Sequence, residues 1–190
     1  MKRMLECCVL GLWLLATVGA SASTIQSQTD EELADTADTI VVGTCIAGES
    51  VWVGKNIYTK VTLAVEDTVK GNAVQQVVVM VPGGVGEVTG DLGTLPVVQK
   101  VEGAPTFYDG EKVFVFLEDA SSLGNFGPSS YQVSGFSQGK LAVIPDAQGN
   151  ERVVRNLEGV TFSDGSHAEA TADAVSLQEF KQKIQDALGN

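Results

Sequence analysis

The chain has 190 residues, with 24 acidic and 12 basic side chains and a formal net charge of −12. Such a negative surface repels nucleic acid and anionic lipid, so it argues against proteins that bind these polyanions by charge. It favours solubility, and it leaves open a basic partner or loosely bound cations. The length suits one domain of ordinary size.

The first 22 residues have the pattern of a secretory signal peptide. Lys2 and Arg3 precede an apolar region at 7–18, whose length of about a dozen residues is too short to span a bilayer. Residues 20–22 (Ala-Ser-Ala) form a small-residue cleavage site. We therefore expect a mature chain that begins at Ser23, is exported to the periplasm or medium, and has no lipid anchor and no membrane span.

Cleavage would leave one cysteine. Cys7 and Cys8 would be removed with the signal peptide, so Cys45 could form no internal disulfide and the domain would depend on its core. Cys45 lies in an apolar run, where a free cysteine behaves as a small hydrophobic residue. A catalytic thiol would instead need access and a lowered pKa, so we expect Cys45 to be buried and reduced.

A short helix is predicted at residues 29–38. Thr29 and Glu32 have the spacing of a capping box, and acidic residues fill the first turn. Leu33 and Ala37 share one face, which should pack on the rest of the domain.

Two long strands follow the predicted helix. Residues 39–46 form a nearly continuous apolar run, typical of a strand buried on both faces, and Gly43 within it indicates a bulge. Residues 57–69 alternate with a period of two and end at a Lys-Gly stop. A third strand at 73–81 would complete an antiparallel meander. Trp52 lies between the first two strands, where it either covers the sheet edge or binds a partner.

The remaining elements are shorter. Residues 82–108 form a long glycine-rich connection with strand pieces at 85–88 and 95–101, and loops of this length are often functional. Further strands are predicted at 112–117 and 152–155, and a hairpin is predicted from residues 131–136 and 140–144. An amphipathic helix closes the chain, with Ser176 and Glu179 at capping-box spacing. Its apolar stripe consists of Leu177, Phe180, Ile184 and Leu188.

One motif suggests an enzyme. Residues 135–139 (Gly-Phe-Ser-Gln-Gly) match the G-x-S-x-G pattern of serine hydrolases, with Asp146, Asp164 and His167 following in the order of that class. The motif requires a strand, a sharp turn and then a helix, whereas a strand-like segment follows here. We therefore favour a turn between two strands, and keep a serine hydrolase that uses Ser137 as the alternative.

Other chemistry has little support in the sequence. Gly84-x-Gly86 follows a strand, but glycines and a proline come after it, so no helix can present its N-terminus to a pyrophosphate. His167 is the only histidine and has no Cys or His at zinc-ligand spacing. Residues 146–151 lack the carboxylate spacing of a calcium loop. We expect no catalytic residue, no metal site and no cofactor.

Several short motifs together resemble netrin-like modules, of which the tissue inhibitors of metalloproteinases are the known case. The chain is also similar to uncharacterised exported bacterial proteins with V-K-G, V-P-G-G, G-A-P-x-F and Q-G-K in this order. The resemblance spans roughly residues 34–144 and rests on these motifs: Ala37-Asp38, Ile40-Val41-Val42-Gly43 with Cys45, Tyr58 with Val61, Leu63 and Val65, Val69-Lys70-Gly71, and residues 110–117 (GEKVFVFL).

The resemblance implies a mainly β fold, a five-stranded antiparallel OB-like barrel with a short N-terminal helix and a C-terminal amphipathic helix. The strand count made from the residues agrees with it. Those inhibitors reach a catalytic zinc through an N-terminal cysteine held by disulfides. The expected mature chain begins at Ser23 instead, so no functional residue is transferred from them.

These observations predict a secreted, non-enzymatic binding module, with a regulator or inhibitor of an extracellular protease as the first candidate and a structural envelope-associated protein as another. OB-like barrels bind through one sheet face and the loops at its rim. The loops of interest are 49–56, 82–108 and 118–130, and the predicted partner-binding residues are Trp52, Gly83, Gly84, Phe107 and Phe126. The predicted organisation is 1–22 signal peptide, 23–28 flexible N-terminus, 29–155 barrel domain, 156–175 polar linker and 176–190 C-terminal helix.

Overall fold

The structure is a computed structural model, and it describes residues 25–72, 74–91, 93–122, 126–127, 129–157, 160–163 and 174–189. The predicted signal peptide, Asp164 and His167 lie outside the described residues, as does most of the predicted linker 156–175.

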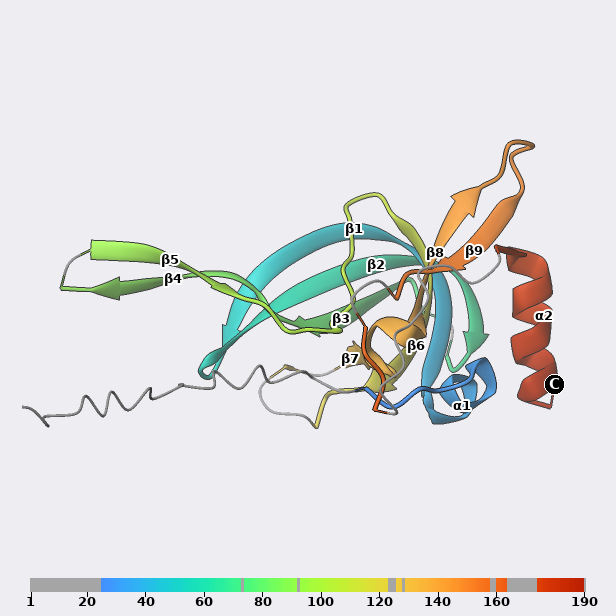
Figure 1. The fold of residues 1–190 in the computed structure, drawn as a ribbon, viewed down its shortest axis with the longest axis horizontal. Helices are drawn as coiled ribbons and strands as arrows, with labels where there is room; N and C mark the ends of the chain where they lie inside the picture. The colour runs from blue at the N-terminus through green and yellow to red at the C-terminus, as the bar shows by residue number, and fades with distance from the viewer. Residues whose placement is uncertain are drawn as a thin grey trace, which may run out of the picture.

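The protein is mainly β, as predicted, and the described residues include two α-helices (Figure 1). The elements in chain order are α1 (Asp30–Thr36), β1 (Thr39–Val53), β2 (Asn56–Lys70), β3 (Gln76–Pro82), β4 (Gly84–Gly90), β5 (Gly93–Gln99), β6 (Lys112–Asp119), β7 (Ser130–Val133), the 3-10 turn η1 (Phe136–Gly139), β8 (Lys140–Pro145), β9 (Glu151–Arg155), β10 (Val175–Ser176) and α2 (Leu177–Ala187).

Five strands pair in a closed ring. The order is β1-β2-β3-β7-β6, and β6 pairs again with β1, with Ile40 opposite Phe116. The predicted meander β1-β2-β3 is confirmed. The prediction of an all-antiparallel sheet is wrong in one pair, because β3 and β7 run parallel. The sheet also has more than five strands: β8, β9 and β10 extend it beyond β6, and β4 and β5 form a separate hairpin.

Strands β1 and β6 are buried on both faces because each contributes to two hydrophobic cores. The inner core lies between the ring strands and takes Val41 from β1 and Val115 from β6. The outer core lies under the helices and takes the neighbouring residues Ile40 and Phe114. Since side chains alternate along a strand, one continuous apolar run serves both cores. The expectation that residues 39–46 are buried on both faces holds for residues 39–43 and Cys45, whereas Thr44 is only partly buried and Ile46 is exposed.

The two helices cover the outer core. In α1, Thr29 and Glu32 form the predicted capping box, with the Glu32 carboxylate accepting from the Thr29 N–H at 2.8 Å. In α2, the Ser176 side chain accepts from the Glu179 N–H. Phe180 of α2 packs edge-on against Phe114, with ring centroids 5.0 Å apart. The helices thus form the cover for the sheet face that carries the large aromatic residues.

The predicted bulge at Gly43 is present. The register of β1 against β2 shifts between Val42 and Gly43. A Cβ atom on Gly43 would lie 2.6 Å from the Ala64 carbonyl oxygen, so the two backbones can approach this closely only at glycine.

The predicted hairpin of residues 131–136 and 140–144 is wrong. Strands β7 and β8 do not pair with each other; both pair with β6, β7 near its end at Leu117 and β8 near its start at Val113. Between them, Gly135 and Phe136 adopt positive φ angles of 63° and 58°. This compact turn moves the chain along the same edge of β6 instead of reversing it beside β7.

Residues 25–28, within the segment expected to be flexible, are held against the domain. The buried Gln138 side chain accepts from the Gln28 N–H at 2.9 Å and donates to the Gln26 carbonyl oxygen at 2.9 Å. Ile25 also forms a parallel bridge with Phe162. Gln138 of the G-x-S-x-G motif therefore has a structural role, since it holds residues 26–28 against the domain.

Candidate binding site at the hairpin end of the ring

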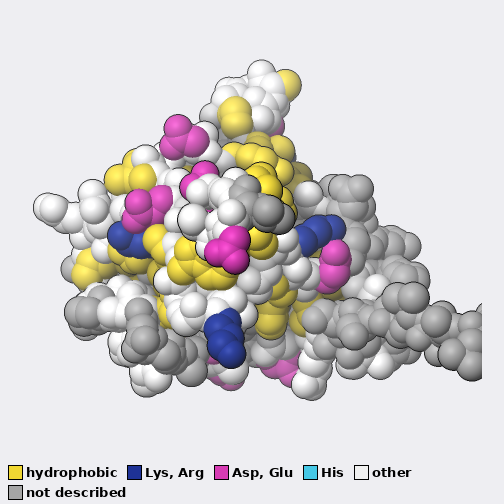
Figure 2. Space-filling view, turned by 90° about the vertical axis from the view of Figure 1, so that its left-hand side faces the viewer, with side chains coloured by type: hydrophobic (Ala, Val, Ile, Leu, Met, Phe, Trp, Pro, Cys, Tyr) yellow, Lys and Arg dark blue, Asp and Glu magenta, His cyan; other side chains and the backbone are white. Residues whose placement is uncertain are grey.

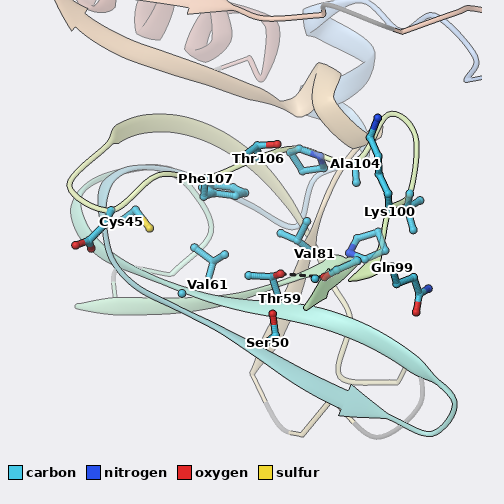
Figure 3. A pocket seen from close by; sticks show the side chains of 17 residues that line it. Cys45, Ser50, Thr59, Val61, Val81, Gln99, Lys100, Ala104, Thr106 and Phe107 are labelled. Atoms are coloured by element: carbon cyan, nitrogen blue, oxygen red, sulfur yellow. Dashed lines mark hydrogen bonds between the residues drawn. The ribbon is translucent and has the colours of Figure 1, made fainter. Parts of the chain in front are cut away.

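The β4–β5 hairpin projects from one end of the ring (Figure 1). A cleft of about 450 Å³ opens at this end (Figure 3). Val61 and Val81 of β2 and β3 lie on one side of it, together with Cys45 of β1. Ala104 and Phe107 lie opposite them, on the connection that follows β5 (Figure 3). The cleft is thus built from inner-core strands and from the long connection that the sequence marked as functional.

Three of the predicted partner-binding residues meet in this cleft. Gly83, Gly84 and Phe107 all line it. The Phe107 ring is half-buried, and the Lys140 ammonium lies 5.0 Å from its centroid, within the range of a cation–π contact. Lys140 is itself paired with Glu111 at 2.6 Å, so the charge that faces the ring is fixed in place.

The other two predicted residues lie apart from the cleft. Trp52, near the end of β1, is 45% exposed, and its indole lies beside Gly86 of β4. Phe126 packs edge-on against Tyr58 of β2 at a centroid distance of 4.8 Å and lines a different hollow. Trp52 therefore belongs to the hairpin's surroundings, and Phe126 does not join Gly83, Gly84 and Phe107.

Polar side chains at the rim of the cleft hold the base of the hairpin. The Ser50 hydroxyl accepts from the Val85 N–H at 3.0 Å, and the Thr59 hydroxyl donates to the Gly83 carbonyl at 2.9 Å. The Gln99 side-chain oxygen accepts from the Ile57 N–H at 2.8 Å. These three contacts, with the backbone bond from the Gly83 N–H to the Ile57 carbonyl, attach both strands of the hairpin to β1 and β2.

Two glycines allow this close attachment. A Cβ atom on Gly84, whose φ is 149°, would lie 2.6 Å from the Ser50 hydroxyl oxygen. A Cβ atom on Gly86 would lie 2.9 Å from both the Trp52 indole nitrogen and the Ile57 side chain. Close packing against β1 and β2 therefore explains why glycine occupies these two positions, without any need for a bound ligand.

Beyond its base, the hairpin exposes apolar side chains. Val85, Val88, Leu95 and Val98 are between 48% and 72% exposed. Figure 2 views the molecule from the hairpin end, where hydrophobic side chains gather over the middle of the face with acidic and basic groups among and around them. Contiguous exposed apolar surface rimmed by polar groups is typical of an interaction site.

The described residues contain neither a cluster of metal ligands nor a membrane-spanning helix. Among them, no group of three or more His, Cys, Asp or Glu side chains could hold a metal ion. Within the same part of the chain, no helix is long and apolar enough to cross a membrane. Cys45 lies at the edge of the cleft, and burial raises the pKa of its thiol, which favours the protonated form.

The residues of the hydrolase alternative are only partly placed. Ser137 lies in η1, and its hydroxyl oxygen is buried without a hydrogen-bond partner among the described residues. Strand β8 follows where a nucleophile elbow needs a helix. The Asp146 carboxylate accepts from the Gln148 and Asn150 N–H groups and so closes the β8–β9 turn. Hydrogen bonds from this turn, first from Asn150, lower the pKa of Asp146.

Comparison with protein-family models, with curated proteins and with solved structures found no match for this chain. The netrin-like resemblance therefore stays a prediction.

The sequence patterns placed most of the hairpin residues in the loops 49–56 and 82–108, but they did not single out the side chains that attach and form the hairpin. Ser50, Thr59 and Gln99 gave no signal because polar residues near turns are common. Val85, Val88, Leu95 and Val98 did give one, a repeated valine and leucine pattern on both sides of a glycine-rich turn, which is typical of a hairpin.

Proposed function

We propose that this protein is an exported, non-enzymatic binding module built on an OB-type barrel. The closed order β1-β2-β3-β7-β6 supports the barrel type, since the OB-fold is a five-stranded Greek-key barrel. Aliphatic side chains fill the inner core, so ligands would bind at the rim. The signal-peptide pattern at residues 1–22 supports export.

The single observation that carries this proposal is the firmly attached, apolar β4–β5 hairpin beside the cleft. The exposed apolar side chains of the projecting arm gain no burial when the chain folds by itself. Contact with a partner would recover that apolar burial. The hairpin and the cleft are adjacent, because Gly84 and Gln99 belong to both.

The partner is proposed to be a protein, with an extracellular protease as the first candidate. The net charge of −12 disfavours nucleic acid and anionic lipid as partners. The protein would then regulate or inhibit the protease by covering part of its surface, without catalysing a reaction.

Two measurements test this function. Secreted proteases of the producing cell are assayed with and without the purified protein, and the protein is used in parallel to capture partners from the culture medium. We expect a change in at least one protease activity together with a stoichiometric complex. Absence of any partner and of any effect on these proteases would contradict the proposal, and recovery of the protein only in an envelope fraction would favour the structural alternative.

The serine hydrolase alternative has its own test. A fluorophosphonate probe should not label the native protein, because the Ser137 hydroxyl oxygen is buried. Labelling that disappears in Ser137→Ala would replace the binding module with an enzyme.

A further inference from the structure

We propose that the β4–β5 hairpin is a rigid arm that inserts into an apolar, basic-rimmed groove of the partner protein. The inference rests on the proposed binding function and says how the partner is recognised. Four features of the described residues lead to it: the fixed base, the apolar pairs on both faces, the protected outer edge and the acidic side chains of the arm.

The base of the arm is fixed before any partner binds. Ser50, Thr59 and Gln99 bond to the two ends of the hairpin or to the strand beneath it, and Gly86 packs directly on Trp52. Further out, the Thr89 and Thr94 hydroxyl groups lie 3.0 Å apart across the two strands. An element ordered in advance loses less conformational entropy on binding, so it suits direct insertion.

The arm is apolar on both of its faces. Val85 lies opposite Val98 on one face, and Val88 lies opposite Leu95 on the other, because residues an odd number of positions apart on a strand point to opposite faces. All four side chains are exposed. A flat partner would cover one face and leave the other in water, whereas a groove covers both.

The outer edge of β5 is protected against strand addition. The Val85 N–H bonds to Ser50 and therefore points away from β5, and in an antiparallel ladder the Glu87–Pro96 pair, two residues on, also turns its backbone groups outward. Because Pro96 has no N–H group, the outer edge of β5 offers no donor at this position. On the other edge, the Val85 N–H is already taken by Ser50. Side chains, rather than an added backbone strand, would therefore carry the recognition.

Charge distinguishes the possible occupants. Glu87 and Asp91 are the charged residues within positions 84–99, and both are exposed. In a symmetric pair of arms these carboxylates would face like charges, and in a lipid layer they would be desolvated without a partner. A protein groove with Lys or Arg at its margin pairs them, which favours a heterologous protein partner.

The experiment places the photo-crosslinking amino acid p-benzoylphenylalanine at Val98 or, as a control, at Ile144, an exposed residue of β8. The full chain is expressed in the producing cell, and the protein crosslinked through position 98 is identified and purified. Its affinity is then measured for the unchanged protein, for the double variant Val88→Ser/Leu95→Ser, and for Ile144→Ser, at low and at high ionic strength. Circular dichroism and thermal unfolding confirm that each variant is folded.

We expect the double variant to bind at least about tenfold more weakly, with Ile144→Ser unchanged. Glu87→Gln/Asp91→Asn should weaken binding at low ionic strength and reduce its salt dependence. If a partner binds the double variant as tightly as the unchanged protein, the binding function stands and the inserted arm is wrong. A crosslink to a second copy, or flotation with phosphatidylcholine–phosphatidylglycerol vesicles that needs the arm, would also overturn the inference. If no partner is found by any route, both proposals fail.

Discussion

Cys45 lies in the inner core of the ring, so the reactivity of its thiol tests whether that core is closed. It is buried in the inner core, its backbone N–H and carbonyl bond to the 110–111 turn, and burial raises the pKa of its thiol. The expectation of a buried, free cysteine is confirmed by the structure.

We predict that the native protein reacts slowly with a thiol reagent and reacts fully only in denaturant. Cys45→Ala should fold with a loss of about 1 kcal/mol in the free energy of unfolding, because a small side chain leaves a small cavity. Cys45→Asp should lose at least about 3 kcal/mol, because it buries an unpaired charge. Rapid labelling of the native protein would show that the strand is accessible and would contradict the inner-core placement.

The neighbours Ser137 and Gln138 should respond to alanine in opposite ways. Within the part of the chain that the structure describes, the buried Ser137 hydroxyl oxygen has no hydrogen-bond partner, so Ser137→Ala should leave stability unchanged or raise it by about 1 kcal/mol. Gln138 bonds to the backbone of Gln26 and Gln28, so Gln138→Ala should cost about 2 kcal/mol and free the N-terminal segment.

Urea unfolding measures the two free energies, and limited proteolysis near residues 25–28 detects the released segment. Equal destabilisation by both variants would show that the Ser137 hydroxyl has a stabilising partner.

At the scale of elements, Asp30 connects three of them. Its carboxylate, near the start of α1, lies 2.6 Å from Arg155 of β9 and 2.6 Å from Lys183 of α2. Burial by itself would raise the pKa of Asp30, but the charges and hydrogen bonds of Arg155 and Lys183 outweigh it and hold the pKa below its ordinary value of 3.8.

Asp30 therefore contributes stability that is fully present above pH 3.8 and is lost as the pH falls through its lowered folded-state pKa. Asp30→Asn should reduce the free energy of unfolding by about 2 kcal/mol at neutral pH, and the difference from the unchanged protein should shrink in acid. Glu31→Gln is the matched control, since its exposed contact to Lys183 should be worth less than about 0.5 kcal/mol. Urea unfolding between pH 2 and 7 gives both curves, and a constant difference across this range would contradict the assignment.

At the scale of the whole molecule, the two cores share their strands. Since β1 and β6 each send alternate residues to the inner and the outer core, neither core can form without the other. We therefore predict one cooperative unfolding transition.

Phe114→Ala, in the outer core, should cost about 3–4 kcal/mol and should expose Cys45 of the inner core at the same lower urea concentration. Helix content by circular dichroism and Cys45 reactivity, followed in parallel, measure the two regions. Val98→Ala on the exposed hairpin is the control and should leave the midpoint unchanged. Separate midpoints for the two probes would mean that the helical layer unfolds independently of the ring.

The sequence predicted those features that depend on local pattern. The capping box at Thr29, the bulge at Gly43, the stop after Lys70 and the apolar stripe of α2 each follow from spacing along a few residues. The same local reasoning placed Gly83, Gly84 and Phe107 in a functional connection, and the structure brings them into one cleft.

Only the tertiary structure decided which strands are neighbours. Strands β7 and β8 look like a hairpin in sequence, because a short turn joins two apolar segments, yet both lie along one edge of β6. The parallel β3–β7 pair and the ring closure by β1 and β6 join residues far apart in the chain, so no local pattern can encode them. The position of β4–β5 depends on Ser50 and Thr59, which contact the base of the hairpin from other strands. The sequence pattern of its apolar residues therefore could not show that they lie beside the cleft.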